Sequence, residues 1–205
     1  MSHKTALLTL NGNCPDFSLM DSLRKESSFH LCTDGAYNGL KKIGIIPDAV
    51  IGDMDSINGK TEDSRIILNS DQQTNDFEKA LNWLIEQKFT TVFLTGVSGG
   101  RLDHEMVNIT IFTAYSDKLD LQLYDENQLA RIVNPGTHYF RGNPGQIISL
   151  LALETSENVT LTGTRYSLND ETLLPGSRGL SNRFENKRAA LSFSRGKIIV
   201  ITQIG

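Results

Sequence analysis

The stretch Pro47-Asp48-Ala49-Val50-Ile51-Gly52-Asp53-Met54-Asp55-Ser56 joins a short apolar run to a pair of acidic residues. The run 49–51 is typical of a buried strand. Asp53 and Asp55 are two positions apart, so in an extended chain both side chains point to the same side. Adjacent carboxylates repel each other unless a cation lies between them, and oxygen ligands of this kind suit Mg²⁺. A polar loop in which Asp55 and Ser56 cap a helix is the alternative interpretation.

Apolar runs and amphipathic segments alternate through the first 125 residues. The clearest amphipathic segment starts at Asn75, a good N-cap that is followed three residues later by Glu78. The expected strands cover residues 5–10, 29–32, 49–51, 66–68, 91–95 and 119–124, and helices are expected to begin near residues 16, 34, 76 and 103. This alternation predicts an α/β domain with a doubly wound, mainly parallel sheet and helices on both faces.

The pattern changes near Asp125. Short β-type runs separated by glycine and proline turns follow, at residues 130–133, 137–140, 146–153, 159–161, 189–193 and 197–202. A smaller all-β domain, a sandwich or small barrel, is therefore expected over residues 128–205, after an α/β domain over residues 1–127.

Composition narrows the class of protein. The chain has 205 residues, 39% of them hydrophobic and 21% charged, which is typical of a globular protein. A net charge of −4 disfavours a broad nucleic-acid surface. No apolar run is long enough for a membrane span, and no secretory signal precedes the first strand. With Cys14 and Cys32 as its only cysteines, the chain has no disulfide framework, so a cytoplasmic location is expected.

Polar residues follow the expected strands where ligands bind in doubly wound sheets, beyond the carboxyl ends. Such a gathering at one edge is a stronger indication of an active site than any one of its members. The aspartates concerned are Asp34, Asp53, Asp55, Asp71, Asp76 and Asp103.

The stretch Gly96-Val97-Ser98-Gly99-Gly100-Arg101-Leu102-Asp103-His104 is the second indication of chemistry. Glycines let the backbone approach a ligand, and N–H groups at a helix start can receive phosphate oxygens. Arg101 offers a fork of donors that matches phosphate. Asp103 is either the N-cap of the next helix or a metal ligand facing Arg101, and His104 is expected on the helix surface or in packing.

Two familiar phosphate-binding patterns are absent from the sequence. No Gly-Lys-Ser/Thr follows the glycine loop, and no Gly-x-Gly-x-x-Gly follows the first strand. Carboxylates, Mg²⁺, an arginine and backbone donors instead suit phosphoryl or pyrophosphoryl transfer, which depends on positioning and charge neutralisation.

The β domain contains Thr162-Gly163-Thr164-Arg165-Tyr166 and Ser177-Arg178-Gly179-Leu180-Ser181-Asn182. One interpretation is two hairpin turns with solvated arginines. The other is an aromatic face, Tyr166, beside the polar groups of Ser181 and Asn182, which together would orient a planar heterocycle.

Taken in order, these motifs resemble the thiamin pyrophosphokinase family along nearly the whole chain. Thr33-Asp34-Gly35-Ala36 is similar to Ala-Asp-Gly-Gly, and the acidic stretch to Pro-Asp…Gly-Asp-Phe-Asp-Ser. Asp71-Gln72-Gln73-Thr74-Asn75-Asp76-Phe77-Glu78-Lys79-Ala80-Leu81 resembles Asp-Gln-Asp-x-Thr-Asp-x-x-Lys-Ala-Leu. Residues 99–104 resemble Gly-Gly-Arg-x-Asp-His, and the two β-domain stretches resemble Thr-Gly-x-x-Tyr/Trp and Ser-Asn.

The resemblance implies an enzyme that moves pyrophosphate from ATP to the hydroxyl of thiamin and releases AMP. It also implies a homodimer with the active site between subunits. Mg²⁺ and phosphate binding would fall to Asp53, Asp55, Asp76 and Asp103. Further nucleotide contacts would come from Asp34, Asp71, Gln72, Gly99, Gly100 and Arg101, with Arg101 neutralising charge. Thiamin would be bound by Tyr166, Ser181 and Asn182 of the partner chain.

Two departures from the family pattern are Gln73 in place of aspartate and Asn75 in place of threonine. Gln73 removes a possible carboxylate, which leaves the number of metal ions and the role of Asp71 open. Asp76 and Asp103 are alternative proton acceptors. Two other functions fit the acidic pair: a Mg²⁺-dependent sugar-nucleotide transferase, and a sensor that binds nucleotide or thiamin without turnover.

Overall fold

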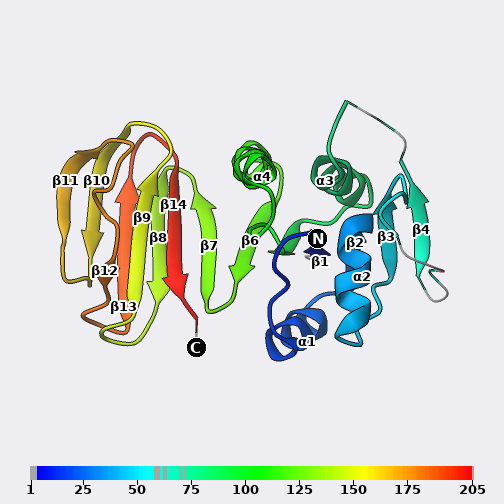
Figure 1. Cartoon of the computed structure of the whole chain (residues 1–205). Coiled ribbons are helices and arrows are strands. Elements are labelled where there is room, and N and C mark those ends of the chain that lie inside the picture. Colours follow the sequence, from blue (N-terminus) through cyan, green and yellow to red (C-terminus); the bar gives the residue numbers. More distant parts are fainter. Residues whose placement is uncertain (1–3, 58–60, 62–63, 70, 72, 205) are drawn as a thin grey trace. The chain divides into compact units, whose positions relative to one another are not determined.

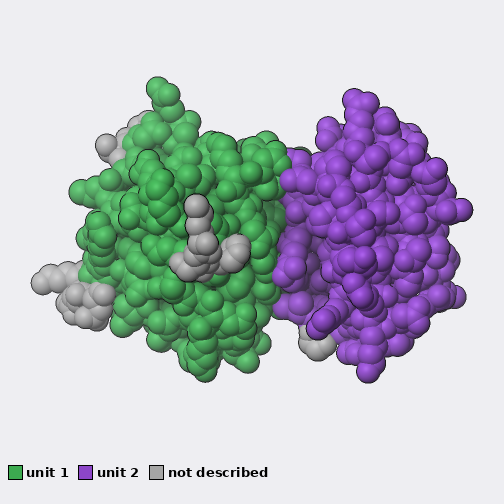
Figure 2. Space-filling view, turned by 180° about the vertical axis from the view of Figure 1, so that it is seen from behind, with its two compact units in different colours: residues 1–126 green, residues 127–205 purple. Residues whose placement is uncertain are grey.

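The computed structural model describes residues 4–57, 61, 64–69, 71 and 73–204. The chain divides into two compact units, residues 1–126 and 127–205, which Figure 2 colours separately. Each unit has its own hydrophobic core. None of the described helices combines the length and apolar character that crossing a bilayer requires.

The first unit contains a parallel sheet in which all described strand pairs have the same direction. The spatial order of its strands is β6-β5-β1-β2-β3-β4. The strands are β1 (Thr5–Thr9), β2 (Phe29–Thr33), β3 (Ala49–Gly52), β4 (Arg65–Leu68), β5 (Thr91–Thr95) and β6 (Asp120–Asp125).

Helices cover both faces of this sheet. They are α1 (Phe17–Glu26), α2 (Asp34–Lys42), α3 (Asp76–Glu86) and α4 (Leu102–Tyr115). Figure 1 shows α1 and α2 on one side of the strands and α3 and α4 on the other. The predicted doubly wound α/β fold is confirmed.

Local sequence explains where the helices begin. The Asn75 side chain accepts the N–H of Glu78 at 2.9 Å and caps α3, as predicted. The Glu78 carboxylate accepts a hydrogen bond from the Tyr115 hydroxyl of α4 at 3.0 Å, so it ties two helices together. The Trp83 ring stacks on Phe29 with centroids 5.5 Å apart, which is a packing role.

The chain order reverses between β1 and β5, because β2, β3 and β4 continue on one side of β1 and β5 starts on the other. In open α/β sheets, ligands bind beyond the carboxyl ends of the strands near such a switch point. The loops after β1 and β5 are close in this structure: the N–H of Gly12 donates to the carbonyl of Gly96 at 2.8 Å, and the N–H of Asn13 donates to the carbonyl of Ser98 at 2.6 Å.

The second unit has two antiparallel sheets that share one core. One has the order β12-β9-β14-β7, and the other β11-β10-β13-β8. The strands are β7 (Gln128–Val133), β8 (Gly136–Arg141), β9 (Ile147–Ala152), β10 (Ser156–Thr162), β11 (Leu168–Leu173), β12 (Asn182–Arg183), β13 (Arg188–Phe193) and β14 (Ile198–Gln203). The predicted sandwich is confirmed.

Strands β11 and β12 do not appear in the sequence-based assignment. Strand β11 buries only Leu168 and Leu173, at its two ends, and its interior is polar. Strand β12 is two residues long. Their backbone pairing with β10 and β9 holds them in place, and a hydrophobic pattern cannot reveal that.

A buried polar chain crosses the centre of the first sheet. The Thr95 hydroxyl donates to Thr9 Oγ1 at 3.0 Å, and Thr9 Oγ1 is hydrogen-bonded to His30 Nε2 at 2.9 Å. Burial, with a smaller contribution from the positive charge of Arg24, lowers the pKa of His30 to about 3. The imidazole is therefore neutral in the folded protein at neutral pH.

This pKa makes folding sensitive to acid. The unfolded chain protonates His30 near its ordinary pKa of about 6.5, whereas the folded chain keeps the imidazole neutral at that pH. Acid therefore favours the unfolded state. The contribution of the neutral His30 to folding stability is present above about pH 6.5 and is lost as the pH falls below it. We expect about 2 kcal/mol of unfolding free energy to be lost through His30 between pH 7 and pH 5. Urea unfolding of the unaltered chain and of His30→Gln at both pH values measures it. Equal pH dependence in the two proteins would contradict the assignment.

Candidate functional site

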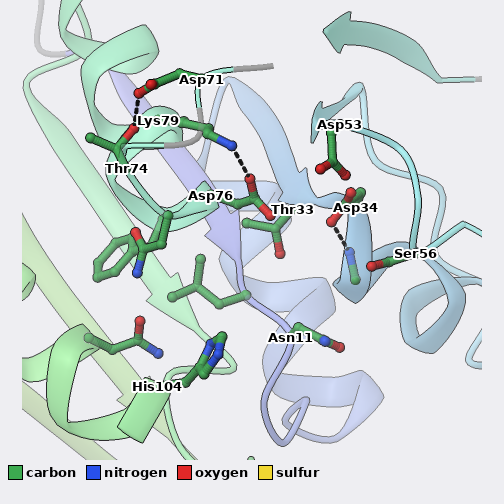
Figure 3. Close-up of a pocket in the computed structure, with 15 residues that line it drawn as sticks. Asn11, Thr33, Asp34, Asp53, Ser56, Asp71, Thr74, Asp76, Lys79 and His104 are labelled. Carbon is green, nitrogen blue, oxygen red and sulfur yellow. Dashed lines mark hydrogen bonds and ion pairs between the residues drawn. The ribbon is translucent and has the colours of Figure 1, made fainter. Parts of the chain in front are cut away.

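A cavity of about 300 Å³ opens at the carboxyl edge of the parallel sheet. Its walls come from the residues that follow β1, β2 and β3, from the segment before α3, and from the first turns of α3 and α4. Its lining side chains include Asn11, Thr33, Asp34, Asp53, Ser56, Asp71, Thr74, Asp76, Lys79 and His104, labelled in Figure 3.

Asp34 is the most buried of the cavity's carboxylates, with 3% of its surface exposed. One of its oxygens accepts the N–H of Gly35 at 2.6 Å, and the other accepts the N–H of Met54 at 3.0 Å. Burial raises the pKa of Asp34, the negative charge of Asp76 raises it further, and the two N–H groups oppose the shift. A bound cation would favour the ionised form.

Asp53 and Asp55 form a compact turn directly after β3. The N–H of Asp55 donates to Asp53 Oδ1 at 3.2 Å, which lowers the pKa of Asp53, and the Ser56 hydroxyl donates to Asp55 Oδ1 at 2.9 Å. Asp34, Asp53 and Asp55 each place a carboxylate oxygen within 4.8 Å of the other two. Three oxygens at this spacing can share one divalent cation.

Two more aspartates line the cavity. Asp71 lies in the segment before α3, and Asp76 is the first residue of α3. Asp71 accepts hydrogen bonds from the Thr74 hydroxyl at 2.5 Å and from the N–H of Gln73 at 2.9 Å, and these lower the pKa of Asp71. Asp76 Oδ1 accepts from Lys79 Nζ at 2.9 Å. Gln72, an expected nucleotide contact, lies outside the described residues.

Lys79 is a cavity residue to which the sequence analysis gave no role. Its side chain is only 6% exposed and pairs with Asp76 one helical turn away. A buried lysine beside an acidic cavity supplies a positive charge for anionic ligand groups. Its place within the stretch 71–81 is the sequence signal that marked it.

Asp103 is not the N-cap of α4, because Arg101 occupies that position. Both Asp103 oxygens instead accept from Arg101, at 3.1 Å and 2.6 Å, which lowers the pKa of Asp103. Among the described residues, Asp103 is not one of the carboxylates grouped with Asp34. The pair is largely exposed.

The backbone N–H groups of the glycine loop already bind a carboxylate of the protein itself. The N–H groups of Gly99 and Gly100 both donate to Glu105 Oε1, at 2.6 Å and 2.9 Å. These N–H groups are the donors that the sequence analysis expected to bind phosphate. The sequence analysis gave Glu105 no role. A second cavity, about 560 Å³, lies beside this loop and shares Asn11, His104 and Asn108 with the first.

Tyr166, an expected thiamin contact in the second unit, is 62% exposed. The Asn182 side chain is buried beside the loop: Nδ2 donates to the carbonyl of Tyr166 at 2.7 Å, and Oδ1 accepts the N–H of Tyr166 at 3.0 Å. Asn182 therefore fixes the backbone of Tyr166. Ser181 has a left-handed backbone, with φ +55, and its N–H donates to Ser149 Oγ at 2.9 Å.

Comparison with known protein families matches both units. Residues 20–124 match the model for "Thiamin pyrophosphokinase, catalytic domain", and residues 137–198 match "Thiamin pyrophosphokinase, vitamin B1 binding domain". The chain belongs to the thiamin pyrophosphokinase family. The resemblance in the motifs and the expectation of an enzyme of this class are confirmed.

Relatives in the thiamin pyrophosphokinase family extend along most of the chain. "Thiamine pyrophosphokinase" of Bacillus subtilis is 29% identical over 170 residues, which is 77% of this chain and 79% of the relative. "Thiamine pyrophosphokinase 2" of Arabidopsis thaliana is 28% identical over 197 residues, 80% of this chain and 73% of the relative.

Solved structures share the fold. The crystal structure of thiamine pyrophosphokinase from Bacillus subtilis superposes with a TM-score of 0.86 at 24% identity, covering 98% of this chain and 99% of that one. Thiamin pyrophosphokinase from Candida albicans has a TM-score of 0.84 at 19% identity, and the match covers 99% of this chain and 90% of that one.

The geometry of Asp34 depends on the absence of a side chain at Gly52. Gly52 has φ +153, and a Cβ there would lie 2.6 Å from Asp34 Cγ. We expect Gly52→Ala to lower the unfolding free energy by about 1–3 kcal/mol. We also expect it to weaken the rise in melting temperature that a cation bound at Asp34 would cause when Mg²⁺ is added.

Gly39→Ala is the matched control, because nothing lies within 4 Å of a Cβ at Gly39, inside α2. That variant should gain about 0.5–1 kcal/mol from higher helix propensity. Chemical denaturation with and without Mg²⁺ measures the unfolding free energy and its Mg²⁺ dependence in the two variants. An unchanged Mg²⁺ response in Gly52→Ala would contradict the cation assignment.

Proposed function

We propose that this chain catalyses Mg²⁺-dependent transfer of pyrophosphate from ATP to the hydroxyl of thiamin. The observation that carries the proposal is the cluster of carboxylate oxygens from Asp34, Asp53 and Asp55. Asp34 and Asp53 of this cluster line the cavity, and the chain belongs to this family. Mg²⁺ held there would neutralise the charge of the polyphosphate and hold it for attack.

In the proposed reaction the thiamin hydroxyl oxygen forms a bond to the β-phosphorus of ATP. The bond between that phosphorus and the oxygen bridging it to the α-phosphorus breaks, and AMP leaves. The hydroxyl proton passes to a carboxylate. We assign it to Asp76 rather than Asp103, because Asp76 lines the cavity, whereas both oxygens of Asp103 accept from Arg101.

Binding of the phosphates is assigned to cationic groups and backbone donors at the same edge. Lys79 lies inside the cavity, and Arg101 and the glycine loop border the second, larger cavity. For a phosphate to meet the N–H groups of Gly99 and Gly100, the Glu105 carboxylate has to move off them. Asp71 shapes the segment before α3 through its bonds to Gln73 and Thr74.

Thiamin binding is assigned to the second unit, which matches the vitamin B1 binding domain. Tyr166 would stack on the heterocycle, Ser181 would offer its hydroxyl, and Asn182 would hold Tyr166 in position. A homodimer whose active site lies between subunits is part of the proposal. Light scattering of the purified chain tests the dimer.

The first test is the reaction itself. With Mg²⁺, ATP and thiamin we expect AMP and thiamin diphosphate in equal amounts, and no product after chelation of the metal. Asp55→Asn should lower kcat/KM at least about 100-fold, because it removes one charged ligand. Chromatography of the products measures this. Formation of ADP, hydrolysis of a sugar nucleotide, or binding without turnover would each contradict the proposal.

The second test separates thiamin binding from nucleotide binding. Tyr166→Ala should raise the KM for thiamin about 10-fold through lost stacking, and leave the KM for ATP unchanged. Tyr139→Ala is the control, because Tyr139 is similarly exposed, at 59%, and packs under Arg188 on another strand. Equal effects of the two variants on thiamin would refute the role of Tyr166.

A further inference from the structure

Three neighbouring strands of the parallel sheet end in a buried threonine: Thr9 on β1, Thr33 on β2 and Thr95 on β5. The hydroxyls of Thr9 and Thr95 bond to each other, and Thr9 also bonds to His30. Within the described part of the chain, the Thr33 hydroxyl is buried and has no hydrogen-bond partner. Thr33 thus differs from its two neighbours in the sheet.

The backbone also leaves the Thr33 hydroxyl unused. Thr33 is the N-cap residue of α2, with φ −72 and ψ 155, and a threonine there normally accepts an N–H of the first helical turn. Thr33 makes no such bond. The N–H of Gly35 donates to the Asp34 carboxylate instead, so capping does not require the hydroxyl.

The hydroxyl belongs to the acidic cavity. Thr33 lines it, and Figure 3 shows Thr33 between Asp34 and Asp76 with its oxygen directed into the pocket. A buried hydroxyl without a partner is unfavourable, and a ligand that supplies the partner removes this cost on binding. Within the described residues, Thr33 therefore combines an unpartnered hydroxyl with a place in the cavity lining.

The chemistry of the cavity selects the type of ligand atom. The carboxylates around Thr33 attract a cation, and Lys79 adds a positive charge. A hydroxyl has one hydrogen to donate, and the acceptors that a metal-bound polyphosphate brings are its non-bridging oxygens.

We propose that the Thr33 hydroxyl donates a hydrogen bond to a non-bridging phosphate oxygen of the Mg²⁺–nucleotide complex and positions the polyphosphate. This inference rests on the proposed function for the identity of the nucleotide. It assigns Thr33 a binding role in addition to its place at the helix start.

The experiment compares Thr33→Val, which keeps the shape and removes the hydroxyl, with Thr33→Ser, which keeps the hydroxyl. Calorimetry with Mg²⁺ and an ATP analogue that has a methylene group between the α- and β-phosphorus gives the Kd without turnover. We expect Thr33→Val to raise the Kd about 10-fold and Thr33→Ser to stay within about threefold of the unaltered chain. The ligand-free melting temperature of Thr33→Val should be unchanged or higher.

Thr95→Val is the matched control. It removes a buried threonine hydroxyl that has a partner at 3.0 Å, so it should lower ligand-free stability and leave the Kd unchanged. The inference is overturned if Thr33→Val binds the analogue like the unaltered chain, if Thr33→Ser is as weak as Thr33→Val, or if Thr33→Val is destabilised without ligand as Thr95→Val is.

The binding experiment also separates this inference from the proposed function. A chain that binds the analogue through Thr33 but forms no thiamin diphosphate would contradict the proposed function alone. A chain that forms thiamin diphosphate, with Thr33→Val unaffected in Kd, would contradict the inference alone. Absence of any binding by the unaltered chain would overturn both.

Discussion

Mutual repulsion among carboxylates is the constraint on which the acidic cavity depends. Asp34, Asp53 and Asp55 bring oxygens within 4.8 Å of one another, an arrangement that is unfavourable without compensating donors. The compensation comes from backbone N–H groups: Gly35 and Met54 serve Asp34, and Asp55 serves Asp53. The fold thus holds negative charges together and leaves their remaining lone pairs available for a cation.

The backbone around these donors is correspondingly unusual. Met54 has φ +70, a left-handed conformation that is uncommon for a residue other than glycine. Gly52 lies so close to Asp34 that a side chain there would collide with the carboxylate. The strained turn directs the Met54 N–H at Asp34, which links the ends of β2 and β3 through one carboxylate. Strain at this turn is part of how the site is formed.

The two units contribute chemistry of different kinds. The first has carboxylates, a buried lysine and a glycine loop at the carboxyl edge of a parallel sheet, which is where ligands bind in doubly wound folds. The second has an exposed aromatic ring whose backbone is fixed by the buried amide of Asn182. In the proposed function, charge neutralisation and heterocycle recognition are therefore assigned to units with separate cores.

The sequence by itself determined the fold class, because strand and helix periodicities alternate in the first part and short β-type runs follow. It also determined which aspartates follow the strands, because the loops after parallel strands share one edge. The short strand β12 and the polar strand β11 escaped it, since both depend on pairing with distant strands. Only the tertiary structure decided how the side chains pair. It placed Asp34 with Asp53 and Asp55, paired Asp103 with Arg101, and put Glu105 on the glycine donors. Among the residues that the structure describes, it also left the Thr33 hydroxyl without a partner. The sequence could not decide these pairings, because a hydrogen bond between side chains depends on differences in distance of a few tenths of an ångström, which no residue pattern encodes.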